Sequence, residues 1–321
     1  RGDVISDGGE ILLTAREAVI DPDVVVQSNG GQIVYSVDDL ILDVSGALVE
    51  ASSVSIYPTT PGRAIDLGTN ASGTLGLTDA ELDRITAETL RIGSSTSGAL
   101  SITAPINPAN ADTLRLSTGA SVTQTASITI ANLAVDAGGS VTLDTQANEV
   151  DNLAMASSAG SVQYRDATGF SVTTVDGVAG IQAGVAIGLV ANSGDVTIVD
   201  TSAADDLAAP LGITINLIGN ESLLTLESGA NVLGPVNLIA DNMDLGGTIM
   251  AVGQDVTLQP YWSRNDAVDL GSTSDNGLDT LELSDAELDR ITAGVLRIGN
   301  TNVGPITISD SVTLDPVVTD T

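Results

Sequence analysis

Aliphatic residues alternate with Thr, Ser or another polar residue in many short runs of this chain, and Gly, Asn or Asp residues separate the runs. A period of two between turn residues is typical of β-strands that bury one face. The pattern therefore predicts an all-β protein made of short strands. Representative runs are Val54–Ile56, Val141–Leu143, Val196–Ile198, Ile213–Ile215, Val256–Leu258 and Ile306–Ile308.

The runs recur at a spacing that points to a solenoid. Ile33 precedes Val54 by 21 residues, and Val236 precedes Val256 by 20. One turn of a parallel β-helix uses about this many residues, because two or three short strands and their corners complete a circuit before the chain stacks on itself. An antiparallel sandwich is the main alternative, but its strands recur every 8 to 12 residues or about that. We therefore expect a parallel β-helix of roughly fifteen turns.

The composition fits stacked turns better than a thick globular core. Apolar residues make up 42% of the chain but aromatic residues only 2%. Stacked turns place Val, Ile, Leu and Ala above one another in ladders, so large rings are not needed to fill the interior. No apolar run approaches the ~20 residues that a membrane-spanning helix requires.

The charged and reactive residues exclude several functions. The chain has 42 acidic residues and 10 basic residues, a net charge of −32, and no His or Cys. All ten basic residues are Arg. A thiol nucleophile, an imidazole base, a Schiff-base lysine and the usual zinc ligands are therefore absent from the sequence. No basic stripe could neutralise a nucleic acid backbone. We expect a protein that is not an enzyme and does not bind nucleic acid.

The most distinctive stretch of the sequence occurs twice. Leu77–Thr103 and Leu283–Ser309 are identical at 16 of 27 positions, with an offset of 206 residues. Similarity continues upstream, where Ile65–Gly68 matches Val268–Gly271. Self-similarity at a long period is typical of repeat architectures. We expect residues 1–321 to form a single continuous β-helix segment with about one and a half copies of a ~205-residue repeat, and to be a fragment of a larger protein.

Each copy of this stretch contains a helix-start signal. A Ser or Thr is followed three residues later by Glu, which matches the capping box, and acidic residues occupy the first turn. Only about two helical turns fit before the next strand-like run. We expect short helical insertions near residues 79–86 and 285–292. The expected structural helix caps are Thr78, Glu81, Ser284 and Glu287.

The repeated stretch resembles a known family. LTDAELDRITA, followed by LRIG and SGALSIT and set among Val-Thr-Leu turns, is similar to the repeats of large bacterial exoproteins and adhesins of the filamentous haemagglutinin type. The resemblance is clearest at residues 54–103 and 256–309. It implies a right-handed β-helix shaft, two-partner secretion, and a role in adhesion or biofilm at the cell surface of a Gram-negative bacterium. The implied partners are other copies or segments of the same surface protein, end to end or side by side, and host or matrix glycans or proteins.

A glycan- or calcium-binding β-helix, including a relic of a polysaccharide-active enzyme, is the alternative function. Tyr261 and Trp262, with Arg264 nearby, are the surface-contact candidates. Calcium could bind acidic residues at the turns, but the nonapeptide that makes such a site recognisable is absent. The residues therefore favour a non-catalytic structural segment of an extracellular protein. We expect no catalytic residue, no cofactor and no metal.

Overall fold

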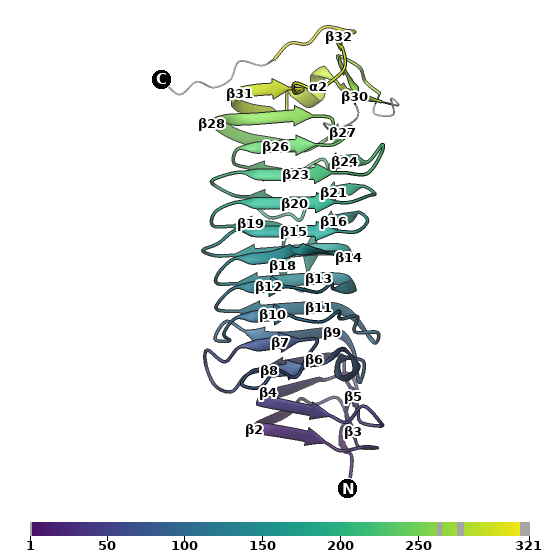
Figure 1. The fold of residues 1–321 in the computed structure, drawn as a ribbon, viewed down its shortest axis with the longest axis vertical. Coiled ribbons are helices and arrows are strands. Elements are labelled where there is room, and N and C mark those ends of the chain that lie inside the picture. Colours follow the sequence, from purple (N-terminus) through teal and green to yellow (C-terminus); the bar gives the residue numbers. More distant parts are fainter. Residues whose placement is uncertain (1, 262–264, 275–278, 315–321) are drawn as a thin grey trace. The chain divides into compact units, whose positions relative to one another are not determined.

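The computed structural model describes residues 2–261, 265–274 and 279–314. It is an all-β protein, 56% strand and 3% helix, whose parallel strands form a β-solenoid of about 12 turns. The predicted fold class is confirmed. The chain divides into two compact units: unit 1 contains Arg1–Ser158 with Val175–Val178, and unit 2 contains Ala159–Thr174 with Ala179–Thr321. Within each unit the strands stack turn upon turn (Figure 1). The single continuous segment expected for residues 1–321 stays a prediction.

Each turn of unit 1 contributes to three ladders of parallel strands, named A, B and C in the order in which the chain meets them. Ladder A contains β1 (Val4–Ser6), β3 (Val25–Ser28), β5 (Leu48–Glu50) and the start of β9 (Ile85–Ser94). Ladder B contains β2 (Ile11–Ile20), β4 (Gln32–Leu42), β6 (Ser53–Tyr57), β9, β11 (Ala111–Thr118), β13 (Thr129–Ala137) and the end of β14 (Val141–Ser157). Ladder C contains β8 (Leu75–Leu77), β7 (Ile65–Leu67), β10 (Leu100–Ile102), β12 (Val122–Gln124) and the start of β14.

Unit 2 has the same three kinds of ladder. Ladder A contains β19 (Ile181–Ala183), β22 (Leu207–Ala208), β25 (Asn231–Leu233) and the starts of β28 (Thr248–Gln259) and β31 (Ile291–Ile298). Ladder B contains β15 (Val162–Asp166), β20 (Ile187–Ala191), β23 (Ile213–Leu217), β26 (Val236–Ile239) and the ends of β28 and β31. Ladder C contains β16 (Phe170–Val172), β21 (Val196–Ile198), β24 (Leu223–Leu226), β27 (Asn242–Leu245), β30 (Thr280–Leu283), β29 (Ala267–Leu270) and β32 (Ile306–Ile308).

The interior is built from stacked aliphatic side chains. Ile33 pairs in register with Val54, and Val54 pairs with Leu90. All three side chains are fully buried. Because parallel strands place equivalent side chains above one another, each aliphatic row continues through the unit as one ladder. This arrangement explains why the core needs so few aromatic residues.

The turns are less uniform than the sequence spacing suggests. Successive partners in ladder B lie between 19 residues apart (Leu114 to Leu133) and 26 residues apart (Ile187 to Ile213) along most of the chain. Two steps are much longer, 36 residues from Val54 to Leu90 and 40 from Val256 to Leu296. The expectation of roughly fifteen turns of equal length was therefore wrong. The number is about 12 because two turns carry insertions.

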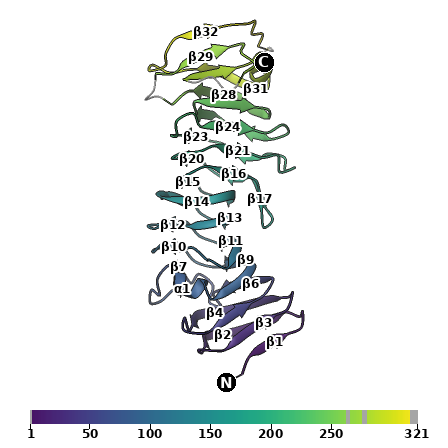
Figure 2. The same ribbon diagram turned by 90° about the vertical axis from the view of Figure 1, so that its right-hand side faces the viewer.

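The two insertions are the two copies of the repeated stretch. Each adds two strands to ladder C, β7 with β8 in unit 1 and β29 with β30 in unit 2, and then a single helical turn. The helices are α1 (Asp79–Leu82) and α2 (Asp285–Leu288). The expected helical insertions are present, but each is shorter than predicted because the chain returns to a strand at Ile85 and Ile291. Figure 2 shows α1 beside β7.

A glycine repeated in both insertions has a steric cause. Gly68 and Gly271 adopt φ angles of 106° and 95°, in the region that favours glycine. A Cβ atom on Gly68 would lie 2.4 Å from the amide nitrogen of Ala104, and one on Gly271 would lie 2.8 Å from the amide nitrogen of Asp310. The backbone of the next turn therefore excludes any side chain at this position.

Two buried tyrosines differ in how their hydroxyl groups are satisfied. Tyr164 donates a hydrogen bond of 2.6 Å to Oδ2 of the fully buried Asp166. Tyr35 is equally buried, but its hydroxyl has no hydrogen-bond partner among the described residues. Burial raises the pKa of Tyr35, so the phenol stays neutral at physiological pH. A buried hydroxyl without a partner destabilises the fold, whereas a paired one supports it.

Replacing Tyr35 with Phe should leave the free energy of unfolding unchanged or raise it by about 1 kcal/mol, because the substitution removes an unpaired polar group. Tyr164→Phe is the matched control and should lower stability by about 1–3 kcal/mol, because the Asp166 carboxylate loses a donor. Urea unfolding of the two variants measures both effects. A clear loss of stability in Tyr35→Phe would show that the hydroxyl has a partner in solution.

Candidate functional site

The one-turn helix of unit 1 is held by a complete capping box. The Thr78 hydroxyl accepts a hydrogen bond of 3.3 Å from the Glu81 amide. In return, Glu81 Oε2 accepts bonds of 2.9 Å from the Thr78 amide and 2.7 Å from its hydroxyl. α2 repeats the arrangement through Ser284 and Glu287. The four residues proposed as helix caps thus lie where a capping box requires them.

The capping glutamate has a second bond that the sequence did not reveal. Glu81 is 3% exposed, and its Oε1 accepts a hydrogen bond of 3.3 Å from the amide of Leu42 at the end of β4. In unit 2, Oε1 of the buried Glu287 accepts a bond of 2.9 Å from the amide of Leu245 at the end of β27. One carboxylate therefore starts the helix and also holds a strand of the preceding turn.

The first helical residue reaches in the opposite direction along the chain. Asp79 Oδ1 accepts a hydrogen bond of 2.6 Å from the amide of Asn107, 28 residues later. Asp285 Oδ1 accepts one of the same length from the amide of Thr313, also 28 residues later. We call the Asp and Glu pair of each insertion the carboxylate clamp: Asp79 with Glu81 in unit 1, and Asp285 with Glu287 in unit 2.

The carboxylate clamp is a structural device by its contacts. Each of its carboxylates accepts bonds from backbone amides, which ties the helical turn to the segments before and after it. No group of three or more acidic side chains in the described part of the chain has the geometry of a metal site. Calcium would need about six or more converging oxygens, whereas these oxygens face amides in different turns.

A second cluster of interacting charges lies on the surface of unit 1. Arg91 and Arg115 are partners in register on β9 and β11. Arg91 forms two hydrogen bonds to the Asp176 carboxylate, 2.7 Å from Nε and 2.5 Å from Nη2. Arg115 donates from Nη1 to the Asp176 carbonyl at 2.5 Å and pairs with Asp136 at 3.3 Å. The hydrogen bond to Asp176 raises the pKa of the Arg91 guanidinium.

Asp176 reaches the two arginines from the tip of a hairpin. β17 (Thr174–Val175) and β18 (Val178–Ala179) pair with each other, and Asp176 and Gly177 connect them with φ angles of 43° and 81°. Two positive φ angles at an Asp-Gly pair are typical of a type I′ turn. Val175 and Val178 pack on the buried Ala134 and Ala154, which give the strands a flat apolar surface.

The other candidates from the sequence have structural or undetermined positions. Tyr261 is half-buried just after β28, and its amide donates a hydrogen bond of 3.3 Å to Asp241. Trp262 and Arg264 lie outside the described residues, so the three residues are not brought together as a site. Asp206 is fully buried and accepts bonds from the Thr201 amide at 2.9 Å and the Asn231 amide at 2.8 Å. Its carboxylate holds a corner of the solenoid.

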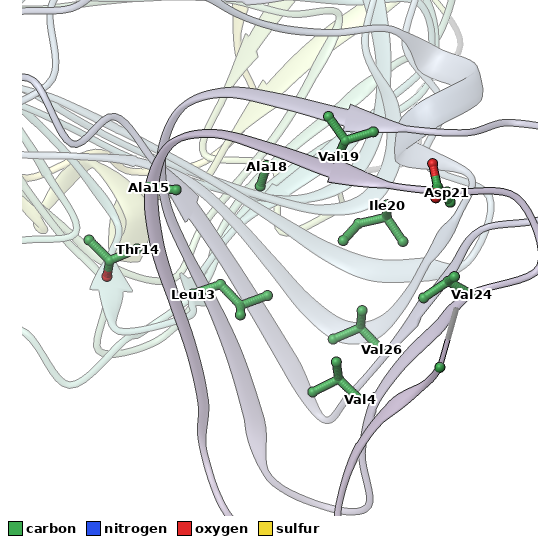
Figure 3. A pocket seen from close by; sticks show the side chains of 11 residues that line it. Val4, Leu13, Thr14, Ala15, Ala18, Val19, Ile20, Asp21, Val24 and Val26 are labelled. Atoms are coloured by element: carbon green, nitrogen blue, oxygen red, sulfur yellow. The ribbon is translucent and has the colours of Figure 1, made fainter.

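A shallow polar hollow lies along one corner of unit 1. Its lining combines amides and hydroxyls with the carboxylates of Glu50, Glu88 and Asp112, across turns formed by β3, β5, β9 and β11. An apolar hollow of about 410 Å³ lies at the first turn, where β1, β2 and β3 surround it (Figure 3). Within the described residues no helix is both long enough and apolar enough to span a membrane.

The chain matches no protein-family model, no curated protein and no solved structure. Its contacts therefore have to support any functional proposal. The clearest functional feature is the carboxylate clamp, because it occurs twice with the same hydrogen bonds. The arginine–aspartate cluster was missed by sequence reasoning, although the Val-Asp-Gly-Val stretch at residues 175–178 is a recognisable hairpin signal.

Truncating the clamp should cost more than removing the cap alone. Glu81→Ala should lower the free energy of unfolding by about 3 kcal/mol, because the buried Leu42 amide loses its acceptor together with the cap. Thr78→Ala removes only the N-cap acceptor and should cost about 1 kcal/mol. Urea unfolding distinguishes the two variants. Equal costs for both would show that the Leu42 amide does not depend on Glu81.

A double-mutant cycle on Arg91 and Asp176 should give a coupling of about 1 kcal/mol, since the pair is bidentate and the Asp176 side chain is largely buried. Arg297 and Asp255 provide a matched control at the equivalent arginine of unit 2. Their side chains are 53% and 56% exposed, so their coupling should stay below about 0.5 kcal/mol. Thermal or urea unfolding of the single and double alanine variants measures both. Equal couplings would contradict a stabilising role for the hairpin tip.

Proposed function

We propose that this chain is a non-catalytic structural segment of a secreted bacterial surface protein, of the kind that the filamentous haemagglutinin-type adhesins exemplify. It extends an exoprotein outward from the cell surface of a Gram-negative bacterium and supports adhesion or biofilm formation. Its partners are other copies or segments of the same surface protein, together with host or matrix glycans or proteins. The repeated stretch, which resembles that family, supports the family assignment.

The carboxylate clamp is the observation that carries this proposal. Both copies of the repeat keep the same acidic residues, and in both copies these residues bind backbone amides of other turns. What the chain repeats is therefore a means of holding an inserted loop onto a solenoid. A protein made of such repeats grows by adding turns, since each turn contacts only its neighbours.

The composition and the site chemistry support the same function. The sequence has no His, Cys or Lys, so the common nucleophiles and bases are missing. A cysteine-free chain also suits export in an unfolded state, because disulfides cannot form before or during passage across a membrane. The net charge of −32 keeps the lateral surface soluble and discourages nonspecific contacts between chains.

Calcium and glycans provide the test against the ligand-binding alternative. The melting temperature of the purified chain should rise equally in calcium and in magnesium, because both divalent ions only screen the acidic surface. The chain should also fail to bind a panel of immobilised glycans. A rise of many degrees in calcium over magnesium would indicate a specific site by mass action. That result, or selective glycan binding, would overturn the structural assignment.

A further inference from the structure

The first turn of unit 1 leaves one edge of its strands open. Among the described residues, β1 pairs with β3 and β2 pairs with β4, and neither has a partner on its other side. The apolar hollow of about 410 Å³ lies at this edge, and Figure 3 shows Val4, Leu13, Ile20 and Val26 around it. Val4 is 43% exposed although it lies in an inward-facing row. We call this surface the leading face.

The internal repeat shows what such a face binds. In unit 2, β22 and β23 occupy the repeat positions of β1 and β2, because Leu207 and Ile213 stand in the same places of ladders A and B as Val4 and Ile11. There the corresponding edges are covered by β19 and β20, two parallel strands of one preceding turn. Leu207, the counterpart of the exposed Val4, is fully buried. The leading face therefore has the form of a surface that a parallel solenoid turn covers.

The last turn of unit 2 has the opposite open edge, which we call the trailing face. Ile306 and Ile308 of β32 are 52% and 70% exposed. Their repeat counterparts Leu100 and Ile102 of β10 are fully buried, because β12 covers them in unit 1. The same side-chain rows are therefore closed by a following turn in one copy of the repeat and open in the other.

We propose that the leading face of one chain binds the trailing face of a second copy, head to tail. The occupant follows from the order of the ladders. After β9 and β10, the chain in unit 1 meets ladder A at Ala111, ladder B at Leu114 and ladder C at Val122. A second copy offers its own first turn in the same order, at Val4 in ladder A and Ile11 in ladder B.

The chemistry of the two faces is matched. Both present unpaired backbone N–H and C=O groups in parallel strands, so each supplies the donors and acceptors that the other lacks. Both also expose aliphatic rows that continue the interior ladders. Because the two faces differ, the contact is heterologous and does not close, so repeated association gives an open filament. This assembly rests on the structural function proposed above and specifies one of its partners.

Single charges placed on either face test the proposal. The wild-type chain should form species whose mass increases with concentration in sedimentation velocity. Val4→Glu blocks the leading face and Ile308→Glu blocks the trailing face, so each variant alone should remain monomeric. Leu211→Glu is the matched control. It adds the same charge at a side chain that is 74% exposed and lies outside both faces, and it should assemble like the wild type.

Mixing the two blocked variants distinguishes a head-to-tail contact from every other association. Val4→Glu keeps an intact trailing face and Ile308→Glu keeps an intact leading face, so an equimolar mixture should form dimers and nothing larger. A monomeric mixture, a wild type that stays monomeric, or assembly in either variant alone would overturn the proposal. None of these outcomes alters the calcium and glycan measurements, so failure of the assembly and failure of the proposed function remain distinguishable.

Discussion

The hydrogen bonding between successive parallel turns is the constraint on which the rest of this structure depends. A strand such as β9 must satisfy its amides with the turns on both sides, here β6 and β11. Stacking in register then aligns the side chains, so inward positions have to be aliphatic and of similar size. Insertions are tolerated only where the chain can return to the same ladder position, as it does at Leu90 and Leu296.

The acidic side chains acquire their importance from the same constraint. Corners and insertions leave backbone amides without a partner in the ladders, and a carboxylate can accept from them. Glu81 and Asp79 do so around α1, and Asp206 does so at a corner between ladders. A chain with 42 acidic residues therefore uses some of them as internal acceptors and leaves the others on a soluble surface.

The sequence predicted the fold class and much of the clamp, but it missed long-range contacts. The period-two runs and their spacing identified the parallel solenoid, and the capping boxes placed both helices. The number of turns was wrong because the insertions lengthen two turns. The bond from Glu81 to Leu42 and the pairing of Asp176 with Arg91 were missed, because their partners lie 39 and 85 residues away.

The sequence by itself determined the features that depend on neighbouring residues: strand periodicity, the Thr78 and Ser284 caps, and the long repeat. Only the tertiary structure decided which turn each carboxylate binds and where the hairpin with Asp176 packs. It also decided that Val4 is exposed while its repeat counterpart Leu207 is buried. The physical reason is that local pattern fixes which face of a strand is apolar, whereas stacking decides whether another turn covers that strand.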